Sequence, residues 1–236
     1  MAGIGLLETQ GLTRHFGGLR AVEAVDFTLN TGQIHALIGP NGAGKTTFVG
    51  LLCGRVPVQA GTIHFDGQDI THMPAHLRVR AGIAYTFQIT SIFRGLSVFD
   101  NVALAAQRPS RHDLGAATKH ILHQVGLESQ INQQADTLSY GHQRLLEIAM
   151  GLALRPRLLI LDEPTQGLSN AEITGFKALV RAVVPQTTVL LIEHNMDVVM
   201  DLADQITVLN MGQTLATGTP ATIQANAAVQ SAYLGG

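Results

Sequence analysis

Short apolar runs separated by polar turns mark several strands along this chain. Residues 34–38, 158–161 and 189–192 are mostly apolar, as is typical of parallel strands covered on both faces. Leu6–Phe16 and Ala21–Leu29 are two further candidate strands around the turn Gly17-Gly18. The pattern predicts an α/β fold with an antiparallel β edge near the N-terminus.

A helical period replaces the strand pattern between about residues 97 and 154, where apolar residues recur every three or four positions. We therefore expect one domain over residues 1–236. Its α/β core would comprise residues 1–90 and 155–236, and an α-helical sub-domain would be inserted at about residues 91–154.

Composition argues against nucleic-acid binding, an intrachain disulfide and a membrane-spanning segment. A formal net charge of −2 over 236 residues provides no basic field for nucleic-acid binding. The single cysteine, Cys53, cannot form an intrachain disulfide, and no apolar run is long enough to span a bilayer. We expect a cytoplasmic chain that meets a membrane only through partners.

A phosphate-binding pattern follows the first buried run, and it reads Gly39-Pro40-Asn41-Gly42-Ala43-Gly44-Lys45-Thr46-Thr47. Glycines let the backbone N–H groups turn toward a polyphosphate, and the N-terminus of the following helix adds to anion binding. Lys45 would reach the β- and γ-phosphates of a nucleotide, and Thr46 would bind the Mg²⁺ that bridges them. Thr47 would lie one residue into the helix. The alternative is a glycine-rich turn that happens to carry a lysine.

Acidic residues follow a second buried run. Asp162 could hold Mg²⁺ through water, and Glu163 could act as general base toward an attacking water. The alternative is a solvated strand end. His194 follows the third buried run, so it should emerge at the same sheet edge and could position the reaction, although a histidine there can also be structural.

Phe16 has two interpretations before any family is considered. An aromatic at this position could stack on an adenine ring. It could equally be a partly buried strand residue.

The ordered motifs resemble those of ATP-binding-cassette (ABC) ATPases, because Leu138-Ser139-Tyr140-Gly141-His142-Gln143 is similar to their signature. The resemblance covers essentially the whole chain and implies a P-loop NTPase fold with a mixed core sheet and ATP hydrolysis with Mg²⁺. It implies that two cassettes share two ATP molecules, each bound between a phosphate loop and the partner's signature. The roles it implies are adenine stacking by Phe16, metal and water sensing by Gln88, γ-phosphate binding by Ser139 and Gly141, a dimer-crossing loop at residues 167–170, and a switch role for His194.

Within that family the chain looks most like ATPase subunits of branched-chain amino-acid importers and of related urea and amide importers. This implies a second cassette, two polytopic permease subunits, a periplasmic solute-binding protein and a location on the inner face of the membrane. Coupling would use residues 89–96, where Ile92 and Phe93 could meet a helix of the permease. The resemblance rests on residues 16–22, 138–141, 146–149, 193–196 and 232–235.

The chain departs from the family pattern at several positions, which are Tyr140, His142, Leu145, Met150 and Asn170, and residues 108–113 look short. Two other classes remain open. A soluble cassette ATPase usually carries two cassettes or a long coiled coil, and this chain has neither. A degenerate cassette that serves only a structural role is disfavoured by the presence of Glu163 and His194.

Overall fold

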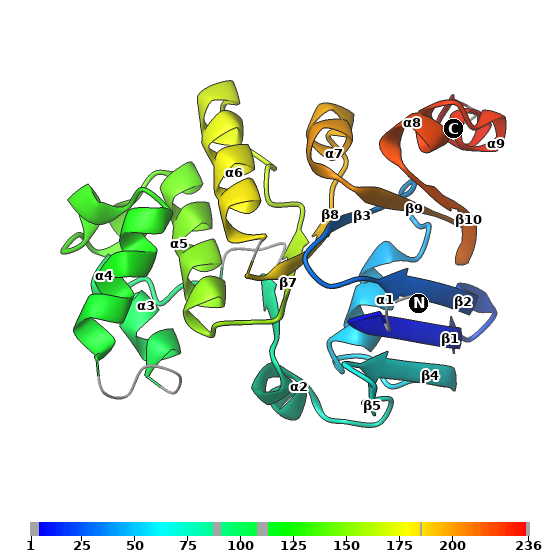
Figure 1. The fold of residues 1–236 in the computed structure, drawn as a ribbon, viewed down its shortest axis with the longest axis horizontal. Helices are drawn as coiled ribbons and strands as arrows, with labels where there is room; N and C mark the ends of the chain where they lie inside the picture. Colours follow the sequence, from blue (N-terminus) through cyan, green and yellow to red (C-terminus); the bar gives the residue numbers. More distant parts are fainter. Residues whose placement is uncertain (1–4, 87–90, 108–112, 185, 235–236) are drawn as a thin grey trace. The chain divides into compact units, whose positions relative to one another are not determined.

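In the computed structural model, which describes residues 5–86, 91–107, 113–184 and 186–234, the first strands form the predicted antiparallel sheet (Figure 1). The Asp66-Gly67 turn, with φ angles of 52° and 75°, connects the two strands at one edge of this sheet. The sheet order is β2-β1-β4-β5. Its strands are β1 (Leu7–Phe16), β2 (Leu19–Leu29), β4 (Ala60–Phe65) and β5 (Gln68–Asp69).

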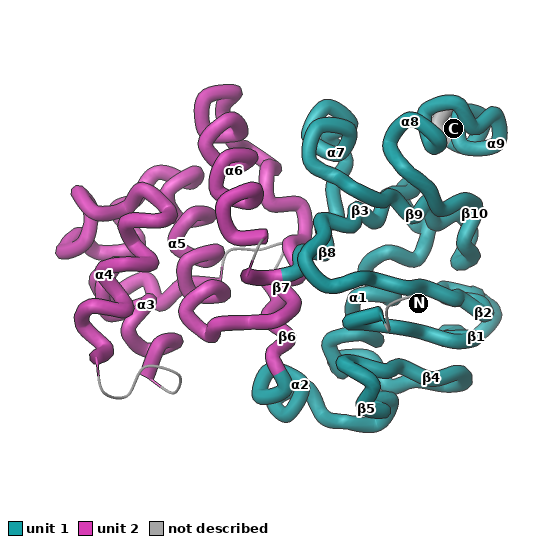
Figure 2. Tube along the Cα trace, viewed as in Figure 1, with its two compact units in different colours: residues 1–81, 188–236 teal, residues 82–187 magenta. Residues whose placement is uncertain are grey.

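A mixed sheet forms next to it from strands that are distant in the sequence. Strand β3 pairs in parallel with β8 on one side and β9 on the other, while β10 is antiparallel to β9. The bounds are β3 (Ile34–Ile38), β8 (Thr188–Ile192), β9 (Gln205–Asn210) and β10 (Gln213–Gly218). All eight of these strands belong to one compact unit, residues 1–81 and 188–236, which we call unit 1 (Figure 2).

Helices cover both faces of strand β3 in unit 1. On one side the ring of Phe48 in α1 packs edge-on against Phe27 of β2, with centroids 5.4 Å apart. On the other side α7, α8 and α9 pack on β3 and β9 (Figure 1). The helices of unit 1 are α1 (Lys45–Leu52), α2 (Ala75–Ala81), α7 (Met196–Leu202), α8 (Pro220–Gln224) and α9 (Ala227–Leu234).

Unit 2, residues 82–187, contains the helices predicted from the helical period. Strands β6 and β7 pair in parallel, and β7 is buried at every position. The elements are β6 (Ile83–Thr86), α3 (Val98–Ala106), α4 (Leu114–Gln124), α5 (Tyr140–Ala153), β7 (Leu158–Asp162) and α6 (Asn170–Val183), with 3-10 turns at Glu128–Gln130 and Ala135–Thr137. The boundaries of an inserted sub-domain at 91–154 stay a prediction.

Arg78 of α2 closes the C-terminal end of the helix that follows the glycine loop. Its Nη1 donates to the carbonyls of Leu51 and Leu52 at 2.7 and 2.8 Å, and its other nitrogens donate to Thr71 and Met73 at 3.0 and 2.8 Å. The side chain is only 2% exposed. A cation at a helix C-terminus is favourable and satisfies carbonyls that the helix leaves over.

His35 is a buried histidine in the middle of β3. Its Nε2 lies 2.8 Å from the Thr207 hydroxyl oxygen, and its ring lies 4.7 Å from the ring of Phe27. Burial lowers the pKa of His35 from 6.5 to about 4. The histidine is therefore neutral near pH 7 and contributes to the core as an aromatic residue.

Replacing Arg78 with Met should destabilise the fold, because the carbonyl groups of Leu51, Leu52, Thr71 and Met73 each lose a hydrogen bond. We expect a loss of about 2–4 kcal/mol in the free energy of unfolding, measured by urea denaturation. Arg80→Met is the matched control, since Arg80 is exposed on the same helix. Equal losses in the two variants would contradict the role assigned to Arg78.

Acidification should destabilise the protein through His35. The unfolded chain binds a proton near pH 6.5 and the folded chain only near pH 4, so stability is complete above 6.5 and falls as the pH drops toward 4. At about 1.36 kcal/mol per pKa unit the loss approaches about 3 kcal/mol at pH 4.

The His35→Leu variant should lack this component, and Thr207 would keep the Thr217 hydroxyl, 3.0 Å away, as a partner. Urea unfolding of both proteins across pH 4–7 measures the difference. Parallel pH profiles for the two proteins would rule out His35 as the titrating group.

Candidate active site

The glycine-rich loop between β3 and α1 packs so closely against neighbouring backbone that two of its glycines exclude a side chain. A Cβ atom on Gly39 or Gly44 would come far inside 3.0 Å of the carbonyl oxygen of Leu209 or Ala21, respectively. Gly42 has open space but a φ of 80°, which residues with a side chain rarely adopt. This tight backbone is the geometry expected of a phosphate-binding loop.

Lys45 folds back onto the same loop. Its ammonium nitrogen Nζ donates to the carbonyl oxygens of Gly39 at 2.6 Å and Pro40 at 3.1 Å, and the side chain is 7% exposed. Helix α1 begins at Lys45, earlier than predicted, so Thr46 and Thr47 both lie in its first turn. The cation and the helix N-terminus thus belong to one short segment, which suits a polyanion.

His194 emerges from the strand beside that loop. Strands β3 and β8 are parallel neighbours, with Leu37 opposite Ile192, so the loop and His194 follow the same carboxyl edge of the sheet. The side chain of His194 is exposed, and the backbone N–H of His194 donates to the Glu193 carboxylate at 2.7 Å. The shared edge that the sequence predicted for these two segments is present in unit 1.

Phe16 lies at the end of β1 and is 45% exposed. The guanidinium carbon of Arg14 lies 4.7 Å from the centre of its ring. The Phe16 hairpin, which we define as residues 14–23, reaches the glycine loop through the contact between Ala21 and Gly44. The ring is accessible for stacking, and its role in binding adenine stays a prediction.

Asp162 ends β7 in unit 2 and is held from two sides. The Tyr85 hydroxyl of β6 donates to its carboxylate at 2.7 Å, and Arg144 of α5 donates to its backbone carbonyl. Arg144 also forms a buried ion pair with Glu147 at 2.5 Å. The acid is therefore fixed in position by a neighbouring strand and a helix.

Glu163, the next residue, has an unusual backbone. Its φ is 48°, a left-handed value that costs a residue with a side chain about 1–2 kcal/mol. The Gln166 N–H donates to its carbonyl at 3.2 Å, which holds the turn. Such backbone outliers gather at functional sites, and this one supports the predicted role of Glu163 without testing it.

The residues that resemble the ABC signature lie at the start of α5. Ser139 is the N-cap of this helix, with its hydroxyl accepting from the His142 N–H at 3.3 Å. Gly141 is buried, and a Cβ atom there would collide with the carboxylate of Glu172. Hydrogen bonds from Ser169 lower the pKa of Glu172, and the two residues form a reciprocal capping box at the start of α6.

Three further features concern positions outside the described residues, metal ligands and membrane spans. Gln88, Ile89 and residues 108–112 lie outside the described residues. Within the described ranges, no group of three or more His, Cys, Asp or Glu side chains could hold a metal ion. No helix of the described parts is long and apolar enough to cross a membrane.

Several residues that position the site were missed by sequence reasoning. Arg144 and Glu147 are three residues apart on α5, a spacing that could have suggested their ion pair. The roles of Tyr85 and Gly212 could not be predicted from local spacing. Tyr85 contacts Asp162, and Gly212 contacts Ala43, and both partners are far away in the sequence.

Comparisons with known proteins agree with this arrangement. A family profile described as "ABC transporter" matches residues 22–166, and one described as "Branched-chain amino acid ATP-binding cassette transporter" matches residues 213–236. The chain is 40% identical to the high-affinity branched-chain amino acid transport ATP-binding protein BraF of Pseudomonas aeruginosa, and 39% identical to LivG of Escherichia coli K12, which has the same description. Each match covers 98% of both chains.

A solved structure has the same fold. The ADP conformation of MJ1267, described as an ATP-binding cassette of an ABC transporter, matches with a TM-score of 0.89 at 25% identity, covering 99% of this chain and 100% of that chain. The predicted fold class, α/β with a mixed sheet, an antiparallel edge and added helices, is confirmed by this match.

Proposed function

We propose, from the premise that this chain belongs to the ABC transporter family, that it powers the import of branched-chain amino acids or a related small polar solute. The family is shown by a profile match over more than half of the chain and by 40% identity over nearly its full length. The resemblance stated from the motifs is confirmed, and the chain is an ATP-hydrolysing transporter subunit.

One observation supports the proposed substrate class. Residues 213–236 match the profile described as a branched-chain amino acid ATP-binding cassette transporter, and they form β10, α8 and α9. The names of BraF and LivG agree with that description.

ATP binding is supported by the geometry of the glycine loop. Its backbone approaches neighbouring carbonyls so closely at Gly39 and Gly44 that only glycine fits, and Lys45 lies against the loop. On binding, Lys45 would exchange its bonds to loop carbonyls for bonds to the β- and γ-phosphates of ATP. Residues 39–47 together would form the phosphate site.

Magnesium fits this chemistry because it is usually held by one or two carboxylates together with substrate phosphates. Among the described residues Thr46 and Asp162 would bind it, and Gln88 is proposed as a further ligand. When bound, the ion neutralises charge that develops on the transferred phosphoryl group. Tyr85 and Arg144 would keep Asp162 in place for this role.

Hydrolysis would use Glu163 to orient an attacking water and accept its proton. His194 would hold the water or the γ-phosphate, and Gln88 would sense both. Ser139 and Gly141 would act on ATP bound to a second cassette, through the N-terminus of α5. Because no single chain would then contain a complete site, we propose that the active form is a dimer of cassettes.

Contact with the permease would use residues 89–96, of which Ile92 and Phe93 carry the apolar surface. Phe93 is 55% exposed, and its backbone is held by the amide of buried Asn101, which donates to the Phe93 carbonyl at 3.0 Å and accepts from its N–H at 2.8 Å. An exposed aromatic on a fixed backbone suits docking to a partner. Through the permease the subunit would lie on the inner face of the membrane and act with a periplasmic binding protein.

The Glu163→Gln variant should bind ATP but turn it over at least about 100-fold more slowly, because a general base contributes at least that factor. Lys45→Ala should instead weaken ATP binding itself. Turnover is measured by phosphate release, and size-exclusion chromatography with light scattering should show that Glu163→Gln forms a dimer with MgATP. Glu128→Gln, an exposed glutamate of the same unit, is the control and should resemble the parent.

Turnover of Glu163→Gln at the parent rate would exclude Glu163 as the base. A variant that binds ATP and stays monomeric would point to a different cassette as the natural partner.

The Phe93→Asp variant should uncouple transport from hydrolysis. In vesicles containing the permease subunits, uptake should fall by about tenfold or more, while basal ATP hydrolysis of the isolated subunit stays within about twofold of the parent. Leu104→Asp is the matched control, because Leu104 is 43% exposed on α3 of the same unit. Equal losses of uptake in both variants would remove the case for a docking role of Phe93.

A further inference from the structure

Three segments of unit 1 meet at Gly212, in the turn between β9 and β10. The N–H of Gly212 donates to the carbonyl of Ala43 in the phosphate loop at 3.0 Å. Its own carbonyl accepts from the Glu23 N–H of β2 at 2.8 Å. One residue is thus bonded to the phosphate loop through one group and to the Phe16 hairpin through the other.

The packing around this residue leaves no room for a side chain. A Cβ atom on Gly212 would lie 2.5 Å from the Arg20 carbonyl oxygen and 3.1 Å from that of Ala21. The Ala21 carbonyl is also the group that excludes a side chain at Gly44. Turn, hairpin and phosphate loop are therefore in direct backbone contact at this point.

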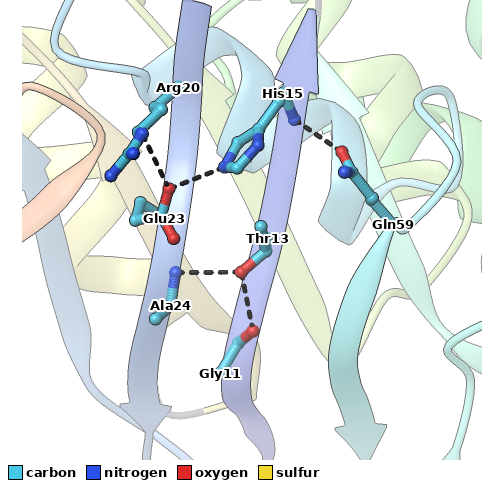
Figure 3. Close-up of polar contacts among 7 residues, drawn as sticks. All are labelled: Gly11, Thr13, His15, Arg20, Glu23, Ala24 and Gln59. Atoms are coloured by element: carbon cyan, nitrogen blue, oxygen red, sulfur yellow. Dashed lines mark hydrogen bonds and ion pairs between the residues drawn. The ribbon is translucent and has the colours of Figure 1, made fainter.

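Glu23 extends the connection to the residue beside Phe16. Its carboxylate Oε2 lies 2.6 Å from Nε2 of His15 and 3.7 Å from Nε of Arg20 (Figure 3). The His15 N–H donates to the side-chain oxygen of Gln59 at 2.8 Å. The contact between Glu23 and His15 joins the two strands of the hairpin in addition to the pairing of His15 with Arg20 and of Phe16 with Leu19, so Glu23 contributes to the position of Phe16.

We propose that Gly212 is a positioning residue that sets the distance between the Phe16 hairpin and the phosphate loop, so that one nucleotide can contact both. This inference rests on the proposed function, because it takes Phe16 as the adenine-stacking residue. The base and the triphosphate are covalently joined, and both contribute fully to affinity only when their two binding surfaces stay at a matching separation. A side chain at residue 212 would push the Phe16 hairpin away from the phosphate loop. The contact between Phe16 and the base would then be lost before the contacts to the phosphates.

The test compares two ligands on the Gly212→Ala variant. Isothermal titration calorimetry with the non-hydrolysable analogue AMP-PNP reports base and phosphate contacts together, and tripolyphosphate reports phosphate contacts alone, both with Mg²⁺. We expect the affinity for AMP-PNP to fall by about tenfold, the range of one aromatic–base stack. The affinity for tripolyphosphate should stay within about twofold of the parent value, because the phosphate loop keeps its own glycines.

Gly67→Ala is a matched control for backbone strain. Gly67 has a φ of 75° after Asp66 at 52°, which closely matches Gly212 at 80° after Met211 at 48°. A Cβ atom on Gly67, however, meets nothing within 4 Å. Gly67→Ala should therefore show a comparable loss of stability from its backbone alone, with both ligand affinities unchanged.

Two results would overturn the proposal. One is an unchanged affinity of Gly212→Ala for AMP-PNP, and the other is an equal loss for both ligands, which would place the effect in the phosphate loop itself. If Gly212→Ala fails to fold, Glu23→Ala tests the next link of the same connection, because it removes the side-chain contacts that join the residue bonded to Gly212 to His15, next to Phe16. That variant should lose affinity for AMP-PNP severalfold and not for tripolyphosphate, and no difference would sink the idea. Failure of the parent protein to bind AMP-PNP would instead refute the proposed function.

Discussion

Backbone-to-backbone packing around the phosphate loop is the constraint on which the nucleotide site depends. At Gly39 and Gly44 the loop presses against carbonyl groups of Leu209 and Ala21, which belong to the mixed and the antiparallel sheet respectively. The loop is therefore fixed by both sheets of unit 1, and each contact exists only because a Cβ atom is missing. A backbone held in this way can present its N–H groups to phosphate without first reorganising, which is the main advantage of a preformed anion site.

The polar groups at the two ends of α1, the helix that follows the loop, have different partners. Its N-terminus carries Lys45 and the loop N–H groups, whereas its last carbonyls are buried and accept hydrogen bonds from Arg78. Arg78 satisfies carbonyls at the C-terminus, where a cation also interacts favourably with the helix dipole. Lys45, at the N-terminus, is held by the loop carbonyls of Gly39 and Pro40. The affinity for phosphate and the stability of the core therefore depend on the same eight-residue helix.

Much of this organisation could be predicted from the sequence, for reasons that are local. The buried runs ending at Ile38, Asp162 and Ile192 are strands because continuous apolar residues suit a covered parallel sheet, and the motif residues follow them directly. Arg78 could not be predicted, because an arginine in a short polar helix is normally solvated, and the carbonyls that bury it are 26 and 27 residues away. Gly212 was missed for the same reason, since its turn resembles the Asp66-Gly67 turn and differs only in what surrounds it.

The groups for the reaction are assembled separately within each unit. The phosphate loop, the Phe16 hairpin and His194 are brought together by β2, β3 and β8 of unit 1, while Asp162, Glu163 and the start of α5 are held together in unit 2. The residues proposed to bind base and phosphates therefore lie in unit 1, and Glu163, the proposed general base, lies in unit 2. On this proposal, a substitution of Glu163 removes the general base and leaves the nucleotide contacts of unit 1 in place, because the two sets of residues are held by separate local contacts.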